Sequence, residues 1–404
     1  MSPIVYAFPV FLVTMGVEAL IARRRGLAIY DVPDAVTSLQ TGMLSQIAGV
    51  FARLLTFALY VAVYDRFAAG TWPTDNILLW GVALLLYDFC YYWNHRLNHE
   101  VGVLWAGHVV HHNSEYYNLS TALRQSSTTW VIGWIFTLPL AVLGVPPVML
   151  ATVGLIDLLY QYWVHTQLVG RIGWFEKILV SPSNHRVHHG QNDYCIDRNY
   201  GGILIIWDRM FGTYADERAA EPVVFGVKKP LASFNPVWAN LHYWAELGGA
   251  SWRASGWRAK LGVWLAPPGG WPDGPQPGFD AAGFRRFDRH TPTALRWYVL
   301  GHYAVINLML AHFLASLYRL GMAQQVGYAV VMTAMMLVLG GLLEGRAWAR
   351  SAEVVRLLAL AGATLLPDWF GFAAPPGVRA ALVAAALVSA LWLVRGPARV
   401  VQAA

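Results

Sequence analysis

Nine long apolar segments constrain the fold of this chain more than any other feature of its sequence. A helix of roughly 17 to 25 apolar residues is long enough to cross about 30 Å of hydrocarbon. The sequence therefore predicts an all-α, multi-pass transmembrane helical bundle with about nine spans. These lie near residues 4–22, 46–64, 77–93, 129–143, 147–163, 297–318, 325–343, 353–367 and 378–394.

The charge content agrees with a membrane protein, because only 13% of the 404 residues are charged whereas soluble proteins carry roughly a quarter. Two breaks organise the chain. Gly144-Val-Pro-Pro147 predicts a tight hairpin between the fourth and fifth spans. The Pro- and Gly-rich run that begins at Ala266 predicts a linker over residues 266–296. We expect a membrane-embedded catalytic region over 1–265 and C-terminal transmembrane helices over 297–404.

The distribution of Lys and Arg predicts the orientation of the spans. With the N-terminus facing outward, 25 of the 29 basic residues fall in the loops of one side and three in those of the other. Basic loops stay in the cytoplasm, so that side is predicted to be cytoplasmic, in a bacterial plasma membrane or the endoplasmic reticulum. The net charge of +6 is then a topology signal and an attraction to anionic lipid. It does not indicate nucleic-acid binding.

Nine of the thirteen histidines lie between residues 95 and 189, in three boxes and one single position. Spacings of three and four place side chains on one face of a helix, so each box can offer two or three nitrogens to one point. A catalytic mononuclear site uses about three protein ligands. Nine imidazoles therefore predict two metal ions with four or five ligands each. The candidate ligands are His95, His99, His108, His111, His112, His165, His185, His188 and His189.

The metal and its substrate are less fully determined by this pattern. Imidazole suits Fe, Zn, Cu and Ni, and the spacing does not separate Fe from Zn. The boxes follow or precede predicted spans, which favours a lipid substrate and oxygen-dependent attack on a C–H bond over zinc hydrolysis. His165 has an alternative interpretation as a donor to a backbone carbonyl. His242 is equally suited to packing or to supporting the metal site, and the remaining histidines are interpreted as packing or interfacial residues: His290, His302 and His312.

The boxes and their flanking residues resemble the fatty acid hydroxylase and sterol desaturase superfamily of membrane di-iron enzymes. Within it, four flanking motifs are most similar to the alkylglycerol monooxygenase branch, and the resemblance covers residues 80–275. The motifs are D-F-C-Y-Y-W from Asp88, S-E-Y-Y-N-L-S-T-A-L-R-Q-S from Ser114, Y-C-I-D-R-N-Y-G from Tyr194 and I-W-D-R-M-F-G-T from Ile206.

The resemblance implies two Fe ions, with Zn as a substitute in isolated protein, tetrahydrobiopterin as cofactor and O2 as co-substrate. It implies hydroxylation of the ether-linked carbon of an alkylglycerol or related lipid, followed by collapse to a fatty aldehyde and a glycerol derivative. The family's ligands correspond by position to the eight box histidines, and His165 matches the histidine of its W-x-H-T segment. Glu100 is the candidate pterin-binding residue, or equally an acceptor that orients His99.

A metal-bound histidine usually donates its second N–H to a carboxylate or to a carbonyl. Acidic residues around the boxes are candidates for that acceptor and for compensating the charge of two metal ions. They are Asp88, Glu115, Asp157 and Asp197, with Asn199 beside them. Asp197 and Asn199 also suit a simple turn. The aromatic residues over 87–93 and 160–163 are compatible with an interfacial belt or with the walls of an alkyl channel.

Two alternative functions are compatible with the sequence. One is another O2-dependent hydroxylase or desaturase of the same superfamily, acting on a fatty acyl, sterol or carotenoid substrate with electrons from a redox protein. The other is a membrane zinc-binding protein with a structural or transport function. Because most predicted spans lack charged residues, the sequence argues against an ion path.

Overall fold

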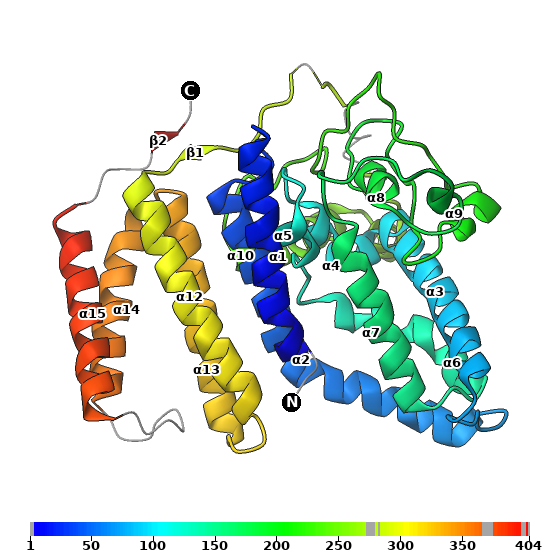
Figure 1. The fold of residues 1–404 in the computed structure, drawn as a ribbon, viewed down its shortest axis with the longest axis horizontal. Helices are drawn as coiled ribbons and strands as arrows, with labels where there is room; N and C mark the ends of the chain where they lie inside the picture. Colours follow the sequence, from blue (N-terminus) through cyan, green and yellow to red (C-terminus); the bar gives the residue numbers. More distant parts are fainter. Residues whose placement is uncertain (1–3, 272–278, 282, 366–374, 397–400, 403–404) are drawn as a thin grey trace.

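The computed structural model is helical almost throughout its described residues, which are 4–271, 279–281, 283–365, 375–396 and 401–402. The first helices of the chain carry or surround the first two histidine boxes (Figure 1). They are α1 Ile4–Arg24, α2 Val32–Phe67, α3 Ile77–Glu100, α4 Gly102–His112, α5 Leu119–Ala122, the 3-10 helices η1 Thr129–Val131 and η2 Gly133–Thr137, α6 Leu138–Val142 and α7 Pro147–Trp163.

After α7 the chain forms a region of loops and short helices before it returns to long helices. The elements are η3 Gly173–Lys177, α8 Pro182–His188, α9 Ile206–Phe211, α10 Pro236–Arg253, α11 Trp257–Leu265, β1 Arg289–His290, α12 Thr293–Ser316, α13 Met322–Leu343, α14 Ala347–Thr364, α15 Pro376–Val394 and β2 Val401–Gln402. The two short strands pair antiparallel, with Arg289 opposite Gln402. Figure 1 shows α8 and α9 gathered at one end of the molecule.

Several helices are long and apolar enough to cross a membrane, which makes this chain an integral membrane protein. Among the described residues these are α3, α12, α13 and α15. The helix α2 adds a fifth if its two parts, Val32–Ala52 and Leu54–Phe67, count as one span despite a bend of 49°. The predicted total of nine spans and the predicted side of the membrane stay predictions.

The prediction of one continuous span over 129–143 is wrong. This segment forms the two 3-10 helices and the five-residue α6 instead, and 3-10 hydrogen bonding does not extend over long runs. The start of the segment is held by polar contacts to other helices: the Ser127 backbone N–H donates to Asn240 (2.7 Å) and the Thr129 hydroxyl donates to the Gly107 carbonyl (3.1 Å). The predicted hairpin is present, with Gly144 in a left-handed conformation (φ +91°).

Local sequence explains where α2 and α3 begin. The Asp31 carboxylate accepts from the Asp34 backbone N–H at 3.2 Å, and Pro33 lies in the first turn of α2, which is a favourable helix start. Asn76 caps α3 in the same way, accepting from the Leu78 N–H at 3.0 Å. The α3 helix then continues without interruption to Glu100, so its last two turns carry the first histidine box.

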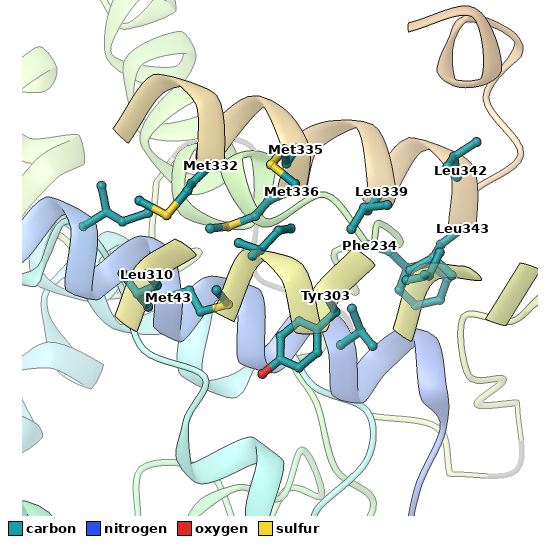
Figure 2. Close-up of a cluster of buried hydrophobic side chains, with 14 of the residues drawn as sticks. Met43, Phe234, Tyr303, Leu310, Met332, Met335, Met336, Leu339, Leu342 and Leu343 are labelled. Atoms are coloured by element: carbon teal, nitrogen blue, oxygen red, sulfur yellow. The ribbon is translucent and has the colours of Figure 1, made fainter. Parts of the chain in front are cut away.

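The C-terminal helices share a hydrophobic core with the N-terminal half. Figure 2 shows this core between α2, α12 and α13, where methionine and leucine side chains from the three helices lie together. Met43 of α2 and Leu310 of α12 are among its buried members. Of the predicted linker 266–296, residues 272–278 and 282 lie outside the described residues. Trp271 is buried against Tyr243, and the predicted division into regions stays a prediction.

Candidate metal centre

All nine candidate ligands come together at one end of the bundle. The end of α3 carries His95 and His99, α4 carries the second box, and His165 follows α7. The third box is on α8, whose first turn is fixed by a reciprocal cap between Ser181 and Asn184. The histidines form two groups in which one ring nitrogen of each member lies within 4.8 Å of the others. The five-histidine group is His95, His99, His108, His112 and His188, and the four-histidine group is His111, His165, His185 and His189.

Helical rotation divides the second and third boxes between the two groups. Each residue of an α-helix is rotated by about 100° from the one before it. His108 and His112, four residues apart, share a face and join the five-histidine group, while His111 is turned toward the other group. In the third box, His185 and His189, also four residues apart, join the four-histidine group, while His188 is turned toward the five-histidine group. The spacing of four therefore brings two nitrogens of each box to one point, as expected, while the third histidine of the second and third boxes belongs to the other group.

Backbone carbonyls fix the orientation of four of the imidazoles. Each of these rings has its Nδ1 at hydrogen-bonding distance from a carbonyl oxygen, and a carbonyl only accepts, so Nδ1 carries the hydrogen and Nε2 is left with a bare lone pair. Such outer hydrogen bonds are typical of metal-bound histidine. The pairs are His95 with Tyr200 (2.8 Å), His111 with Arg124 (3.0 Å), His165 with Gln161 (2.7 Å) and His188 with Arg198 (2.9 Å).

The bare nitrogens point at one another, and this arrangement fits a metal ion. The Nε2 atoms of His111 and His165 are 3.2 Å apart, yet neither carries a hydrogen to share, and a cation between them would relieve the repulsion. Ligands at about 2.1 Å from one metal ion and at right angles are separated by about 3.0 Å. His185 continues the pattern at 3.1 Å from His165, and the Nε2 atoms of His99 and His189 are buried without a hydrogen-bond partner.

The surroundings keep these imidazoles neutral, which is the form that binds metal. Burial lowers the pKa of His111 to about 4. Burial, followed by the charge of neighbouring histidines, also holds the pKa of His108, His165 and His185 well below the ordinary value. The cluster therefore offers lone pairs rather than positive charges at neutral pH.

Glu100 and Asp197 lie at the margin of the five-histidine group. The Glu100 carboxylate is partly exposed and accepts from Arg96, one helical turn earlier, at 2.8 Å. It is Asp197 that faces His99, with its carboxylate oxygen 3.9 Å from Nδ1. Burial raises the pKa of Asp197 above its ordinary value. The indole of Trp105 packs on the ring of His99.

The turn around Asn199 supplies carbonyls to the five-histidine group. Asp197 and Asn199 both have a φ of +57°, a left-handed conformation that Asn and Asp tolerate better than most residues. The Asn199 amide donates to the Asn184 and Ala215 carbonyls and accepts from the Ala215 N–H. Asn199 thus holds the turn from which Arg198 and Tyr200 accept. Asn199 therefore forms a turn and, through that turn, supports the candidate metal site, which were the two interpretations that the sequence left open.

Two buried carboxylates lie against the same loop. Asp88 accepts from the backbone N–H groups of Ile203 and Leu204 and from the Trp207 indole, at 2.7, 3.1 and 2.8 Å. Asp157 accepts from Gln161 at 2.6 Å. A Cβ on Gly202 would lie 2.6 Å from an Asp157 oxygen and 3.0 Å from an Asp88 oxygen, so only glycine allows the loop to approach both.

The remaining predicted residues lie away from the two groups. Glu115 accepts from the Phe287 N–H at 2.5 Å, and burial raises its pKa to about 7. His242 packs within α10, with Nδ1 2.9 Å from the Ala239 carbonyl. His302 contacts Arg356, and His312 contacts Tyr328.

Two supporting residues were not assigned a role from the sequence. Arg124 is buried and donates to the Val110 carbonyl and to Ser38 of α2, which fixes the carbonyl that accepts from His111. Glu18 of α1 accepts from Thr166, Tyr30 and the Leu119 N–H, so it connects α1 to the residue after His165. Arg124 stands in the motif that follows the second box. For Glu18 the signal was an acidic residue inside an apolar run.

A cavity of about 440 Å³ opens beside both histidine groups, within the usual size range of small-molecule sites. Its wall includes His95 and His108 of the five-histidine group and His111 and His165 of the other. Polar residues line it near the histidines, and the rest is largely apolar. The aromatic side chains among its lining residues are Phe8, Phe11, Tyr87, Tyr91 and Tyr162.

The fold and the histidine geometry define an integral membrane protein with a candidate dinuclear, all-imidazole metal centre. The model of the fatty acid hydroxylase family matches residues 80–213. Among curated proteins, alkylglycerol monooxygenase of Danio rerio is 47% identical over 60% of this chain and 53% of its own length. The Homo sapiens protein of that name is 41% identical over 67% of this chain and 61% of its own length. The Xenopus tropicalis protein of that name is 36% identical over 80% of this chain and 74% of its own length.

These similarities assign the chain to the fatty acid hydroxylase family, on its alkylglycerol monooxygenase branch. The matched part of the chain spans about half to three quarters of the length of these relatives. No solved structure shows a significant match. The resemblance stated from the three boxes and their flanking motifs is confirmed.

Proposed function

We propose that this protein is a membrane di-iron monooxygenase that hydroxylates the ether-linked carbon of alkylglycerol lipids, with O2 as co-substrate and tetrahydrobiopterin as electron donor. The observation that carries the proposal is the cavity, because one continuous space joins apolar walls to histidines of both groups. An alkyl chain fits such walls, and its ether carbon then lies beside the metal centre.

The proposed reaction balances with these components. One oxygen atom of O2 enters a C–H bond next to the ether oxygen, and the other leaves as water, with two electrons from the pterin. The hemiacetal that forms breaks its C–O bond to give a fatty aldehyde and a free glycerol hydroxyl. Two iron ions held by the nine imidazoles would supply the oxygen activation.

The residues of the chain have distinct tasks in this proposal. Asn94, Asn98, Ser126 and Thr129 line the cavity beside the histidines and suit the glycerol end of the lipid. The Asn94 carbonyl oxygen is buried without a hydrogen-bond partner, so it is available to accept from a substrate hydroxyl. The apolar walls exclude water from the alkyl end. With polar residues beside the histidines and apolar walls elsewhere, the cavity would orient the lipid with its ether bond near the metals.

Orientation in the membrane is part of the proposal. We propose a multi-pass arrangement in which the histidine end lies on the cytoplasmic side. The support is the excess of Lys and Arg in the loops at that end. A bacterial plasma membrane and the endoplasmic reticulum both provide this arrangement, in which a soluble pterin reaches the centre from water and the lipid from the bilayer.

Purified protein loaded with iron is expected to release fatty aldehyde from a 1-O-alkylglycerol when O2 and tetrahydrobiopterin are both present. Aldehyde trapping and mass spectrometry measure the product. Product formed only with a ferredoxin or cytochrome donor, or only from a fatty acyl, sterol or carotenoid substrate, would favour another hydroxylase or desaturase of the family. Tight zinc binding with no oxidation of any of these lipids would favour the zinc-binding alternative.

Glu100→Gln is expected to raise the KM for tetrahydrobiopterin about tenfold while metal content stays unchanged. Glu100 is partly exposed next to His99, and a carboxylate that accepts from the pterin ring loses about 1.4 kcal/mol when replaced by a neutral amide. Glu246→Gln is the matched control, because Glu246 is also ion-paired, to Lys229 at 2.9 Å, and is absent from both histidine groups. Loss of metal from Glu100→Gln would instead assign Glu100 to orienting His99.

A further inference from the structure

We infer that α12 forms the wall against which the alkyl chain of the substrate lies, so that Ala311 and Leu314 determine which chains are accepted. The inference rests on the proposed function and gives the C-terminal helices a role in substrate selection. It follows from the shape of the cavity and from how α12 is held in the fold.

The cavity extends from the metal centre to the C-terminal bundle. At one end its wall is made by histidines, and elsewhere by residues of α1, α2, α7 and α12. Phe8 and Phe11 contribute from α1, and Leu310 and Leu314 from α12. The four residues that α12 contributes recur at intervals of three and four, which places them on one helix face: Asn307, Leu310, Ala311 and Leu314.

The lining on this side suits a hydrocarbon chain. Leu39 and Met43 of α2 line the cavity together with Leu310 and Leu314, and burial of apolar surface is the main source of affinity for such a chain. The one amide that α12 adds, Asn307, donates to the Tyr303 carbonyl at 3.1 Å within its own helix. The polar groups suited to the glycerol end lie beside the histidines, and α2 also adds Ser45 and Gln46 to the lining.

The α12 wall is fixed with respect to the metal centre. Met43 and Leu310 belong both to the cavity lining and to the buried core between α2, α12 and α13 (Figure 2). On its other side α2 is joined to the histidine region, because Ser38 accepts from Arg124, whose carbonyl accepts from His111. A displacement of α12 would therefore disturb a packed core, and the distance from this wall to the metals is set by the fold.

One substitution on this wall adds bulk without disturbing the core. Ala311 lines the cavity and is exposed rather than packed, so Ala311→Trp is expected to fold normally and to shorten the space for the chain. Leu308→Trp is the matched control. It introduces the same side chain one turn earlier in α12, where Leu308 is 71% exposed and does not line the cavity.

The test uses a series of 1-O-alkylglycerols with dodecyl, hexadecyl and eicosyl chains. For Ala311→Trp, kcat/KM for the eicosyl substrate is expected to fall about tenfold relative to the dodecyl substrate. That change corresponds to lost burial of roughly two methylene groups. Leu314→Ala is expected to shift the preference toward the longer chains, and Leu308→Trp to retain the wild-type ratio. An unchanged chain-length ratio in both Ala311→Trp and Leu314→Ala overturns the inference.

A second readout separates this inference from the proposed reaction. The thermal stability of the purified protein in detergent is measured with each alkylglycerol, since a ligand that binds the folded state raises Tm. If no aldehyde is formed but long chains stabilise wild type more than Ala311→Trp, the reaction is wrong and the wall is supported. If aldehyde is formed but the stabilisation by each chain is the same in wild type and Ala311→Trp, the wall is wrong and the reaction stands. If no alkylglycerol stabilises the wild-type protein, the inference is overturned.

Discussion

Replacing His165 with Ala is expected to lower the metal content of the purified protein from about two ions per chain to about one, and to abolish turnover. His165 has its Nε2 3.2 Å from that of His111 and 3.1 Å from that of His185. Its removal leaves the four-histidine group with three ligands and an open side, whereas the five-histidine group keeps all its members. The measurement is metal analysis by mass spectrometry beside aldehyde release.

His242→Ala is the matched control for this substitution. His242 is a half-buried histidine of α10 whose Nδ1 faces the Ala239 carbonyl, and it belongs to neither group. We expect it to retain both metal ions. A wild-type content near one ion per chain would contradict the division into two groups, and an unchanged content in His165→Ala would show that the three remaining histidines are enough to hold the second ion.

The sequence was sufficient to identify the candidate ligands but not to sort them into two groups. Nine histidines at spacings of three and four predicted two metal ions with four or five ligands each, and the structure groups the same nine residues as five and four. The division of a box between two centres depends on which way each helix is rotated. That rotation is set by packing, for example by Arg124, which donates to the Val110 carbonyl of α4 and to Ser38 of α2.

The groups that accept hydrogen bonds from the candidate ligand histidines were the least predictable part of the site. Carboxylates and carbonyls were both expected to accept from the histidines, and four imidazoles face backbone carbonyls, among them those of Tyr200 and Arg124. Every residue has a carbonyl, so sequence gives no sign of which one will be used. What the sequence did contain was Asp88 and Asn199, the side chains that hold the carbonyl-bearing loops in place.

Hydropathy identified apolar segments but not their conformation. Residues 129–143 are apolar enough to be read as a span, and the structure divides them into 3-10 turns and a short helix. The start of the segment is tied to α10 and α4 by the hydrogen bonds of Ser127 and Thr129. These contacts join segments far apart in sequence, which a window of local hydropathy does not register.

Asp88→Ala is expected to reduce the free energy of unfolding by at least about 3 kcal/mol, since each of three buried donors left without an acceptor costs about 1–3 kcal/mol. The donors are the Ile203 and Leu204 N–H groups and the Trp207 indole. Thermal unfolding in detergent measures the loss. Asp88→Asn keeps one acceptor oxygen and is expected to be intermediate. Asp193→Ala is the control, because Asp193 is exposed and its one ion pair, to Lys228, lies at the surface.

Asp88→Ala also distinguishes a general loss of stability from a loss of the metal site. The loop held by Asp88 carries the Tyr200 carbonyl that accepts from His95, and His95 belongs to the five-histidine group. In a His165→Ala background the remaining metal resides in that group, so adding Asp88→Ala is expected to lower the content from about one ion toward zero. If the double variant keeps its metal at temperatures below its Tm, Asp88 stabilises the fold without positioning the ligands, and the carbonyls of the loop are not needed to hold His95 in place.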